Sequence, residues 1–574
     1  MRLLQKARQR IQEFIATVKR PDRALIAHII PRKRPSLAQI QHVDLFLDTW
    51  EKNLIGAFGF IALISILGIF WSVRLLNTVP GPATGGYFQE VLVGSPRHIN
   101  PIFATSDTDK TLTNIVFLPL CDSFDRKIPA IAASCEFNGQ KSVTVTLADR
   151  TWHDGEPITA DDVIFTIQTM QNSAVGSPWR ALAARVTAAK DADGRVIITA
   201  KQSTPEFLTI ASIGIIPKHL WEPIEPAKMM RSELNLKPIG SGAFAYNTAI
   251  IDRDSFVESI DFDVFSDFKP HRAYLDELEF RIAPDDATAY DLFKTRQVDA
   301  FFVHDPAQTA ELVKRDVNRY EITPPIIVSL FFNPSHTAVF KKREVRQAFA
   351  LAIDRATLVK EVLGGNGIPT RSPFPPSTLK NQKYIQPDLA ADEALQLFKK
   401  NKVGGTSSTP YILGVPALPT FQSLAENIKT QLAPLGITIV PALIGSGTKT
   451  GALLSYDLLI LGQDYGISGN AYPYWHTSAS SESGTNYARY QIKEVDSWLD
   501  QLQVETRPEN RQNLLEKLSQ RLVNDSPALF LYQPTYQYYV SNKVHGIEIP
   551  STIDASDRFL HSEKWYRATT RTPR

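Results

Sequence analysis

The sequence predicts an α/β or mixed α and β protein of two or three lobes, preceded by one transmembrane helix. Three observations lead to this fold class. One apolar run, Asn53 to Val73, is long enough to cross a membrane. From Tyr87 to about Trp565 apolar periodicity continues without a low-complexity break, and about 480 residues exceed what one hydrophobic core supports. Helical and strand-like patterns alternate along this part, which indicates mixed architecture.

The apolar run reads NLIGAFGFIALISILGIFWSV and is bounded by Lys52 and Arg74. About 20 apolar residues, at ~1.5 Å of rise each, cross the ~30 Å hydrocarbon core of a bilayer. We predict an uncleaved anchor over residues 53–76. A cleaved signal peptide is the alternative, but its charged region is short, whereas about fifty residues precede this run.

The segment before the run, residues 1–52, is basic. Because Lys and Arg are retained on the cytoplasmic side of a membrane, we expect a cytoplasmic N-terminus and a large C-terminal part outside the cytoplasmic membrane. The whole chain has a net charge of only +2, so we expect no nucleic acid partner. We interpret the tail as a topology signal that contacts anionic lipid, with nucleic acid binding as the alternative. Its basic residues before Lys52 are Arg2, Lys6, Arg8, Arg10, Lys19, Arg20, Arg23, Arg32, Lys33 and Arg34.

A Pro/Gly segment, NTVPGPATGG from Asn77 to Gly86, follows the anchor. Its composition cannot bury a core, so we interpret it as a spacer. The ectodomain then runs over residues 87–574.

The two cysteines of the chain, Cys121 and Cys135, both fall in this outer part. A disulfide between them would close a short loop and contribute about 3 kcal/mol in the chain-entropy estimate. Two buried free thiols are the alternative. Two cysteines alone cannot build a zinc site.

Several segments carry clear secondary-structure patterns. Thr159 precedes Asp162 by three residues, which predicts a helix N-cap with an acidic complement to the helix dipole. Apolar residues spaced i, i+3, i+4, i+7 and i+8 predict two further helices, each with one buried face. Gly436 and the strand-like run ITIVPALI follow the second helix. The two faces consist of Val345, Ala348, Phe349, Ala352 and Ile353, and of Phe421, Leu424, Ala425, Ile428 and Leu432.

The segment YDLLILGQDYG, from Tyr456 to Gly466, has a continuous apolar run that is too short for another membrane span. It predicts a strand covered on both faces. Its polar end, Gln463, Asp464 and Tyr465, would emerge where α/β sheets place their ligands.

No catalytic motif is recognisable. The sequence contains neither H-E-x-x-H nor G-x-S-x-G. In IGSGTKTG, Lys449 follows Thr448 rather than the second glycine of a phosphate loop, so we interpret this segment as a turn. IGSGAF, from Ile239 to Phe244, lacks the dinucleotide fingerprint. We therefore predict no enzymatic activity, no cofactor and no metal site, with an extracellular hydrolase as the alternative.

One stretch carries a family signature. TWHDGEPITADDVIFTI, from Thr151 to Ile167, follows the pattern W-x-D-G-x-P-x-T-A-x-D-V-x-F-T. It resembles the family 5 extracellular solute-binding proteins, the dipeptide, oligopeptide and nickel receptors of bacterial ABC importers. The residues in step are Trp152, Asp154, Gly155, Pro157, Thr159, Ala160, Asp162, Val163, Phe165 and Thr166.

Four further segments resemble the same family in the same order. In the segment PIGSGAFAY, Ser241 and Ala243 replace the Thr and Pro that are commoner in the family. The segments are VGSPRHINPIFATSDTD (93–109), PIGSGAFAY (238–246), FFNPSHTAVFKKREVRQAFALAIDRATLV (331–359) and NAYPYWHTSASSESGTNYARYQIKEVDSWLDQL (470–502).

This resemblance implies a two-lobed periplasmic-binding-protein-like fold of type II with an additional inserted domain. Lobe I would comprise about 87–115, 205–327 and 528–574, the inserted domain about 116–204, and lobe II about 328–527. The signature residues are expected to be scaffold. In such a receptor, ligand contacts to both lobes favour the closed state.

The resemblance also implies ligand contacts. In peptide-binding relatives an aspartate after a strand holds the free amino terminus, and Asp464 with Tyr465 occupies the corresponding position. A buried ammonium needs such an anionic acceptor. This chain continues GISGNAYPYW rather than with the Asp-Pro common in the family, and a surface-loop aspartate is the alternative. Tyr472, Tyr474 and Trp475 are expected to form an aromatic wall for apolar side chains of the ligand, with packing between the lobes as the alternative. The hydroxyls of Thr105 and Ser106 are expected to contact the ligand backbone. Arg371 is expected to bind a peptide carboxylate.

Together these features predict a membrane-anchored receptor that captures small peptides and delivers them to an ABC permease. The permease and ATPase subunits would be encoded elsewhere, because this chain has one span and no ATP-binding motif. The alternatives are the same receptor class for a nickel chelate, haem or an oligosaccharide, and a non-transport sensor that uses the same fold.

Overall fold

The computed structural model describes residues 9, 12–13, 48–122, 127–138, 141–201, 207–303, 316–403, 410–445, 448, 450–466, 468–481, 484–505, 507–549 and 554–573. Nearly all of the basic tail lies outside these residues. The chain forms two compact units, Met1–Gly81 with Thr569–Arg574, and Pro82–Ala568.

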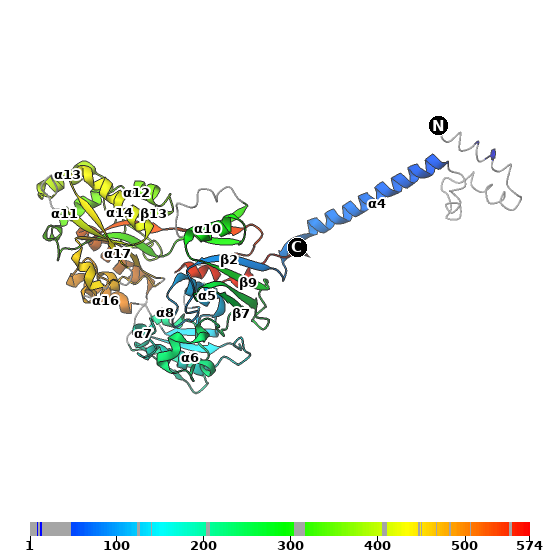
Figure 1. The fold of residues 1–574 in the computed structure, drawn as a ribbon, viewed down its shortest axis with the longest axis horizontal. Coiled ribbons are helices and arrows are strands. Elements are labelled where there is room, and N and C mark those ends of the chain that lie inside the picture. Colours follow the sequence, from blue (N-terminus) through cyan, green and yellow to red (C-terminus); the bar gives the residue numbers. More distant parts are fainter. Residues whose placement is uncertain are drawn as a thin grey trace. The chain divides into compact units, whose positions relative to one another are not determined.

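The first unit contains helix α4 (Thr49–Asn77), the blue helix in Figure 1. Among the described residues it is the one helix long and apolar enough to cross a membrane, over Thr49–Arg74 with a mean hydropathy of 2.4. It begins four residues before the predicted anchor, because Asp48 and Glu51 form a capping box at its start. Strand β1 (Thr78–Pro82) pairs with β19 (Thr569–Pro573). The predicted spacer is therefore wrong in part, since half of it is a paired strand.

The second unit contains three sheets. The first is a seven-stranded sheet in the order β11-β18-β10-β2-β9-β8-β7, which with its helices we call lobe I. Strands β2, β9 and β10 run parallel, and β18 runs antiparallel to β10. The bounds are β2 (Tyr87–Val93), β7 (Phe244–Ile251), β8 (Val257–Val264), β9 (Glu277–Ala283), β10 (Ala300–Val303), β11 (Val317–Ile322) and β18 (Tyr536–Ser541), with helices α5 (Asp107–Val116) and α10 (Asp286–Lys294).

The second sheet, of four antiparallel strands in the order β3-β4-β6-β5, forms the inserted domain. Its apolar residues belong to the same hydrophobic cluster as those of lobe I. Cys121 and Cys135 form a disulfide, which decides between the two alternatives left open by the sequence. The bounds are β3 (Ala132–Asn138), β4 (Ser142–Leu147), β5 (Val186–Lys190), β6 (Val196–Ala200), α6 (Ala160–Gln171), α7 (Arg180–Ala183), α8 (Phe207–Ala211) and α9 (Lys218–Trp221).

The third sheet has six strands in the order β13-β17-β12-β16-β14-β15 and forms lobe II. Helices α11 to α14 pack on one face of it, and α15 to α17 on the other; Figure 1 shows the two groups on opposite sides. The bounds are β12 (Ile326–Phe332), β13 (Gly367–Pro369), β14 (Tyr411–Pro416), β15 (Ile439–Ile444), β16 (Leu458–Asp464), β17 (Ala528–Pro534), α11 (Arg343–Ala352), α12 (Arg355–Val362), α13 (Ala391–Lys400), α14 (Pro419–Leu432), α15 (Tyr472–Trp475), α16 (Lys493–Val504) and α17 (Pro508–Asp525).

The predicted local elements are confirmed. Thr159 caps α6 in a capping box with Asp162. The predicted apolar face of α11 is fully buried, and that of α14 is buried except for half-buried Phe421. Strand β16 lies between β12 and β14 inside its sheet, as a doubly covered strand must.

One predicted boundary is wrong. Strand β17 belongs to the lobe II sheet, where it pairs with β12, so the chain returns to lobe I after Pro534 rather than at residue 528. Similarly β12, starting at Ile326, already belongs to lobe II. The chain therefore crosses between the lobes close to Ile326 and between Pro534 and Tyr536.

Candidate ligand-binding cavity

A cavity of about 830 Å³ lies between lobe I and lobe II, within the size range of small-molecule sites. Lobe I contributes the residues after β2, the first turns of α5 and α10, and the start of β18. Lobe II contributes β12, β16 and β17 and the first turn of α14. The lining residues used below are Ser106, Asp107, Asp285, Asp286, Ile326, Val328, Thr420, Phe421, Gly462, Tyr532, Tyr536 and Gln537.

Sheet topology explains why these residues meet. In lobe I the parallel strands β2, β9 and β10 end at one edge of the sheet, and the antiparallel strand β18 begins there. In lobe II the parallel strands β14 and β16 likewise end at one edge. Ligands of open α/β sheets bind outside the carboxyl ends of the strands. The cavity thus occupies the position that the strand directions dictate.

Asp464 is the last residue of β16 and pairs with Ile326 of β12. Side chains two residues apart point to the same face of a strand, so Asp464 faces the same side as Gly462, which lines the cavity. The backbone N–H of Gly466 donates to Asp464 Oδ1 at 2.8 Å, and Tyr474 Oη donates to the Asp464 carbonyl at 2.7 Å. Surrounding protein raises the pKa of the Asp464 carboxyl, the Asp554 carboxylate raises it further, and Lys110 opposes them.

Lobe I presents a charged cluster toward Asp464. Lys110 Nζ donates to Asp554 Oδ2 at 2.6 Å. Burial raises the pKa of Tyr536 to about 12, with further contributions from Asp107, Asp554 and Asp464. Three carboxylates therefore share the field of one lysine at this position. The excess negative charge suits a ligand ammonium group.

Tyr465 and Trp475 lie in the core of lobe II. They are 1% and 0% exposed, Trp475 Nε1 donates to Tyr465 Oη at 3.2 Å, and their rings pack on Phe374, Phe331 and Phe530. A fully enclosed ring has no surface left for a ligand. The predicted ligand contact is corrected for these two residues, which are packing residues within one lobe.

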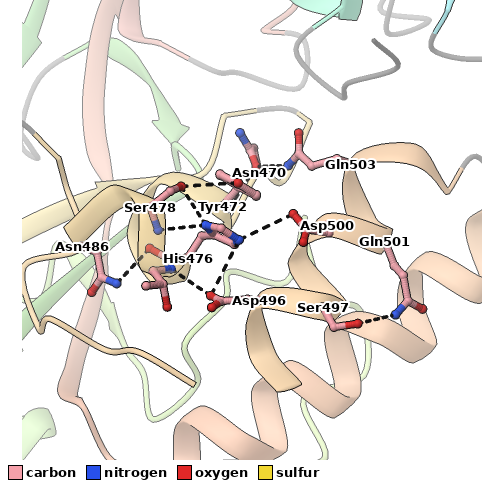
Figure 2. Close-up of polar contacts among 11 residues, drawn as sticks. Asn470, Tyr472, His476, Ser478, Asn486, Asp496, Ser497, Asp500, Gln501 and Gln503 are labelled. Atoms are coloured by element: carbon pink, nitrogen blue, oxygen red, sulfur yellow. Dashed lines mark hydrogen bonds and ion pairs between the residues drawn. The ribbon is translucent and has the colours of Figure 1, made fainter. Parts of the chain in front are cut away.

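Tyr472 belongs to a polar network at the start of α16, shown in Figure 2. Its ring stacks on His476 with centroids 4.1 Å apart. His476 Nδ1 lies 2.7 Å from Ser478 Oγ, and its Nε2 lies between Asp496 and Asp500 at 3.8 and 3.5 Å. The network joins the segment after β16 to helix α16. Tyr472 is half-buried and does not line the cavity.

The remaining predicted contact residues, Thr105, Ser106 and Arg371, do not all lie at the cavity. Ser106 lines the cavity and caps α5 by accepting from the Asp109 backbone N–H at 3.1 Å; Thr105 beside it is exposed. Arg371 is in lobe II, where its guanidinium pairs with Asp388 at 2.9 Å, and it does not line the cavity. The structure therefore brings Ser106 and Asp464 to the cavity region and leaves Arg371 apart from it.

Four cavity features escaped the sequence analysis. Asp285 and Asp286 follow the end of β9 after Pro284, close to the strand-end position that singled out Asp464, so that rule would have found them. Gln537 carries no such signal. The first turn of α14, with Thr420 and Phe421, contains no acidic residue, so its dipole leaves this end of the cavity weakly positive.

The signature motifs are scaffold. Trp152 is fully buried, and Asp154 Oδ2 pairs with His219 Nε2 at 2.8 Å. In the PIGSGAF segment the backbone N–H groups of Ser241 and Gly242 both donate to the Val116 carbonyl. Within the described residues no group of three or more His, Cys, Asp or Glu side chains is placed to hold a metal ion.

Residues 127–486 match the family model "Bacterial extracellular solute-binding proteins, family 5 Middle". The protein belongs to this family. Members of the family 5 receptors act in transport and are not enzymes. Among curated relatives, the oligopeptide-binding protein AppA of Bacillus subtilis is 23% identical over 514 residues, which cover 85% of this chain and 92% of AppA.

Several solved structures share the fold. The substrate-binding protein CtaP of Listeria monocytogenes matches with a TM-score of 0.74 at 24% identity, over 84% of this chain and 99% of CtaP. AppA of Bacillus subtilis, in complex with a nonapeptide, matches with a TM-score of 0.68 at 22% identity, over 85% of this chain and 100% of AppA. NikZ of Campylobacter jejuni, in complex with Ni(L-His), matches with a TM-score of 0.67 at 21% identity, over 84% of this chain and 99% of NikZ. The two-lobed fold is thus common to receptors of chemically different solutes.

Proposed function

We propose that this protein is a membrane-anchored receptor that captures small peptides outside the cytoplasmic membrane and delivers them to an ABC permease. The observation that carries the proposal is the cavity whose walls come from both lobes, with Asp464 on the sheet face that borders it. A ligand that contacts both walls stabilises the closed arrangement, which is the form a transporter must distinguish.

The charges around the cavity support a peptide with a free amino terminus. Asp464 of lobe II and the Asp554 and Asp107 carboxylates of lobe I all interact with Lys110, so three carboxylates surround this one ammonium group. A ligand ammonium would complete the neutralisation through charge-assisted hydrogen bonds. Helix α14 follows β14, which lies two strands from β12 in the same sheet. The weakly positive first turn of α14 offers a binding position for a peptide carboxylate, in place of Arg371.

The proposed anchor is helix α4, with the basic tail in the cytoplasm. A tether raises the local concentration of the receptor near its permease, so a modest affinity between the two suffices. The permease and its ATPase are separate chains in this proposal.

The test is native mass spectrometry of the full chain, purified from its host in detergent, followed by release and sequencing of any retained solute. Retained short peptides of varied sequence support the proposal. A nickel chelate, a haem or an oligosaccharide as the retained solute overturns the peptide assignment. An empty protein that also binds no member of a synthetic peptide library favours the sensor alternative.

A further inference from the structure

The two walls of the cavity differ in chemistry. Lobe I presents mainly hydroxyl, carboxyl and amide side chains, such as Ser106 and Asp107. Lobe II presents mainly apolar side chains, and none of the described residues that it contributes to the lining carries a charge. Its apolar lining residues include Ile326, Val328, Leu363, Leu418, Phe421 and Tyr532. The lobe II wall therefore suits an apolar part of a ligand.

This apolar wall is the open end of a stripe that begins in the core of lobe II. Alternate residues of β12 face the same side of the sheet, namely Ile326, Val328, Leu330 and Phe332. At the inner end, Phe332 packs on Phe349 of α11. Val328 belongs to the same hydrophobic cluster and also lines the cavity, whereas half-buried Ile326 lines the cavity outside that cluster. The stripe thus runs from beneath the helices into the cavity.

Gly462 leaves room beside this stripe. It lies directly opposite Val328 in the antiparallel ladder between β12 and β16, and residues opposite each other share a face of the sheet. A Cβ at Gly462 would meet Ile326 Cγ2 at 3.3 Å, so any side chain here would lie on the apolar stripe. On its other side, Val328 pairs with Tyr532 of β17. One neighbour of Val328 is therefore an aromatic ring and the other has no side chain, which leaves a recess between them.

The start of α14 adds apolar surface to the same cavity. Leu418 is 56% exposed, and Phe421 is half-buried. Leu418 is the N-cap residue of α14 and makes no side-chain cap hydrogen bond, at a position where Ser, Thr, Asp and Asn are preferred. The leucine therefore does not serve the helix cap. An apolar ligand group that covers it would remove its surface from water, which favours binding.

We propose that the receptor selects peptides that carry a large apolar side chain, and that the lobe II wall holds this side chain. We call the binding surface the apolar recess; it consists of Ile326, Val328, Leu418, Phe421, Gly462 and Tyr532. The inference rests on the proposed peptide-receptor function and names its substrate class. Asp464 pairs with Ile326 in the same ladder. A peptide with its ammonium group at Asp464 therefore brings a side chain near its amino terminus within reach of the recess.

The test uses the full chain in nanodiscs and isothermal titration with trialanine and with alanine tripeptides in which one position is Leu or Asn. Asn resembles Leu in shape but carries an amide in place of the methyl groups. We expect the Leu peptide to bind about tenfold or more tightly than trialanine at the first or second position, because its larger apolar side chain leaves water. The Asn peptide should bind no more tightly than trialanine, since burial of its amide on an apolar wall is costly.

Two variants assign the preference to the recess. Leu418→Ser removes an exposed apolar side chain, and Ser is a favoured N-cap, so the fold should be retained; the Leu preference should fall about threefold or more. Gly462→Val fills the recess and should bind the Leu peptide no more tightly than trialanine. As the matched control, Leu389→Ser makes the same change at a leucine of lobe II that is 48% exposed and does not line the cavity. This control should retain the full preference.

The outcomes separate this inference from the function on which it rests. Equal binding of the Leu peptides and trialanine by the unaltered protein overturns the apolar-side-chain inference and leaves the peptide receptor standing. A preference that survives both variants also overturns it, and Leu418→Ser alone decides if Gly462→Val does not fold. Binding of isopentylamine, an apolar amine without a peptide bond, together with no peptide binding would keep the recess and overturn the peptide function. If neither isopentylamine nor any peptide binds, both are wrong.

Discussion

Lys110 Nζ lies 2.6 Å from Asp554 Oδ2, and Asp464 of the other lobe interacts electrostatically with both residues. Burial lowers the pKa of Lys110, but the attraction of Asp554 outweighs it and the pKa is raised. The same pairing holds the pKa of Asp554 below its usual value in spite of burial. This pair is therefore charged throughout the neutral range. In the proposed function, Asp464 is the carboxylate whose charge the ammonium group of the ligand would neutralise.

Asp464→Asn should weaken binding of peptides with a free amino terminus by about tenfold to a hundredfold, because it removes a charge-assisted bond. N-acetylated peptides should bind both proteins equally weakly. Since the pKa of Asp464 is raised in the free protein, affinity should fall with decreasing pH already above the ordinary Asp pKa of about 3.9. Titration calorimetry between pH 4 and 7 measures this. An Asn variant with unaltered affinity would remove Asp464 from the site.

The buried side chain of His153 should make the folding stability of the protein depend on pH. Its Nε2–H donates to the Gly242 carbonyl at 3.0 Å, and its Nδ1 accepts from the Gly240 N–H at 3.2 Å, so the neutral ring uses both nitrogens. Burial lowers the pKa of His153 from 6.5 to about 4. Between pH 6.5 and about pH 4 the unfolded chain binds more protons than the folded chain, so the free energy of unfolding should fall as the pH decreases through this range.

Urea denaturation at pH 7, 5.5 and 4 measures that loss. His153→Gln, which does not titrate, should show a flatter dependence on pH. The exposed His271→Gln serves as the matched control and should keep the slope of the unaltered protein. Equal slopes for all three proteins would contradict the assignment.

Gly240→Ala should destabilise the protein by about 1–3 kcal/mol, as overpacking in a core does. A Cβ at this position would overlap the backbone carbonyl of Val116, which cannot move aside because it accepts hydrogen bonds from Ser241 and Gly242. Chemical denaturation of the purified protein measures the change. Gly445→Ala, where a Cβ meets nothing closer than an ordinary contact, should change stability little.

Local pattern predicted the parts of this fold that depend on neighbours in sequence. The capping box at Thr159, the helix-to-strand unit ending in β15 and the covered strand β16 with Asp464 at its end all follow from spacing and composition. Asp285 and Asp286 obey the same strand-end rule and were predictable in principle.

The rest depends on residues far apart in the chain. Gln537 is buried at the cavity because β18 inserts between β10 and β11, more than 200 residues away along the chain. No local pattern distinguishes it from a solvent-facing strand residue. Tyr465 and Trp475 became core residues because Phe331, Phe374 and Phe530 enclose them. An aromatic residue beside a polar strand end suits a ligand wall equally well, so sequence alone could not decide.

The Cys121–Cys135 disulfide closes a loop with a sequence separation of 14. Loss of this cross-link should cost about 3 kcal/mol of folding free energy and lower Tm by several degrees. Scanning calorimetry of the double variant Cys121→Ala, Cys135→Ala measures this, and a reductant should lower the Tm of the unaltered protein without affecting the variant. A Tm that responds to neither change would mean that the loop is already constrained by its packing.

Arg567 joins the end of the ectodomain to its beginning. Its guanidinium donates to the Tyr87 carbonyl at 2.9 Å, makes a bidentate pair with Asp299 at 3.1 Å for both contacts, and lies 5.0 Å above the Tyr87 ring. Nearby, the Ala83 N–H donates to the Ala568 carbonyl. Within the second unit, residues 82–88 are thus fastened to the last residues of this unit and to lobe I.

Arg567→Ala should release this fastening and speed amide hydrogen exchange about tenfold over residues 82–88, since local opening then costs less free energy. Arg567→Lys keeps the charge without the bidentate geometry and should give an intermediate rate. Peptide affinity should not change, because the cavity lies at other strand ends of lobe I. Arg195→Ala, which breaks an ion pair with Asp191 in the inserted domain, is the matched control and should leave exchange at 82–88 unaltered. Unchanged exchange in Arg567→Ala would show that the backbone contacts of this segment hold it without the guanidinium.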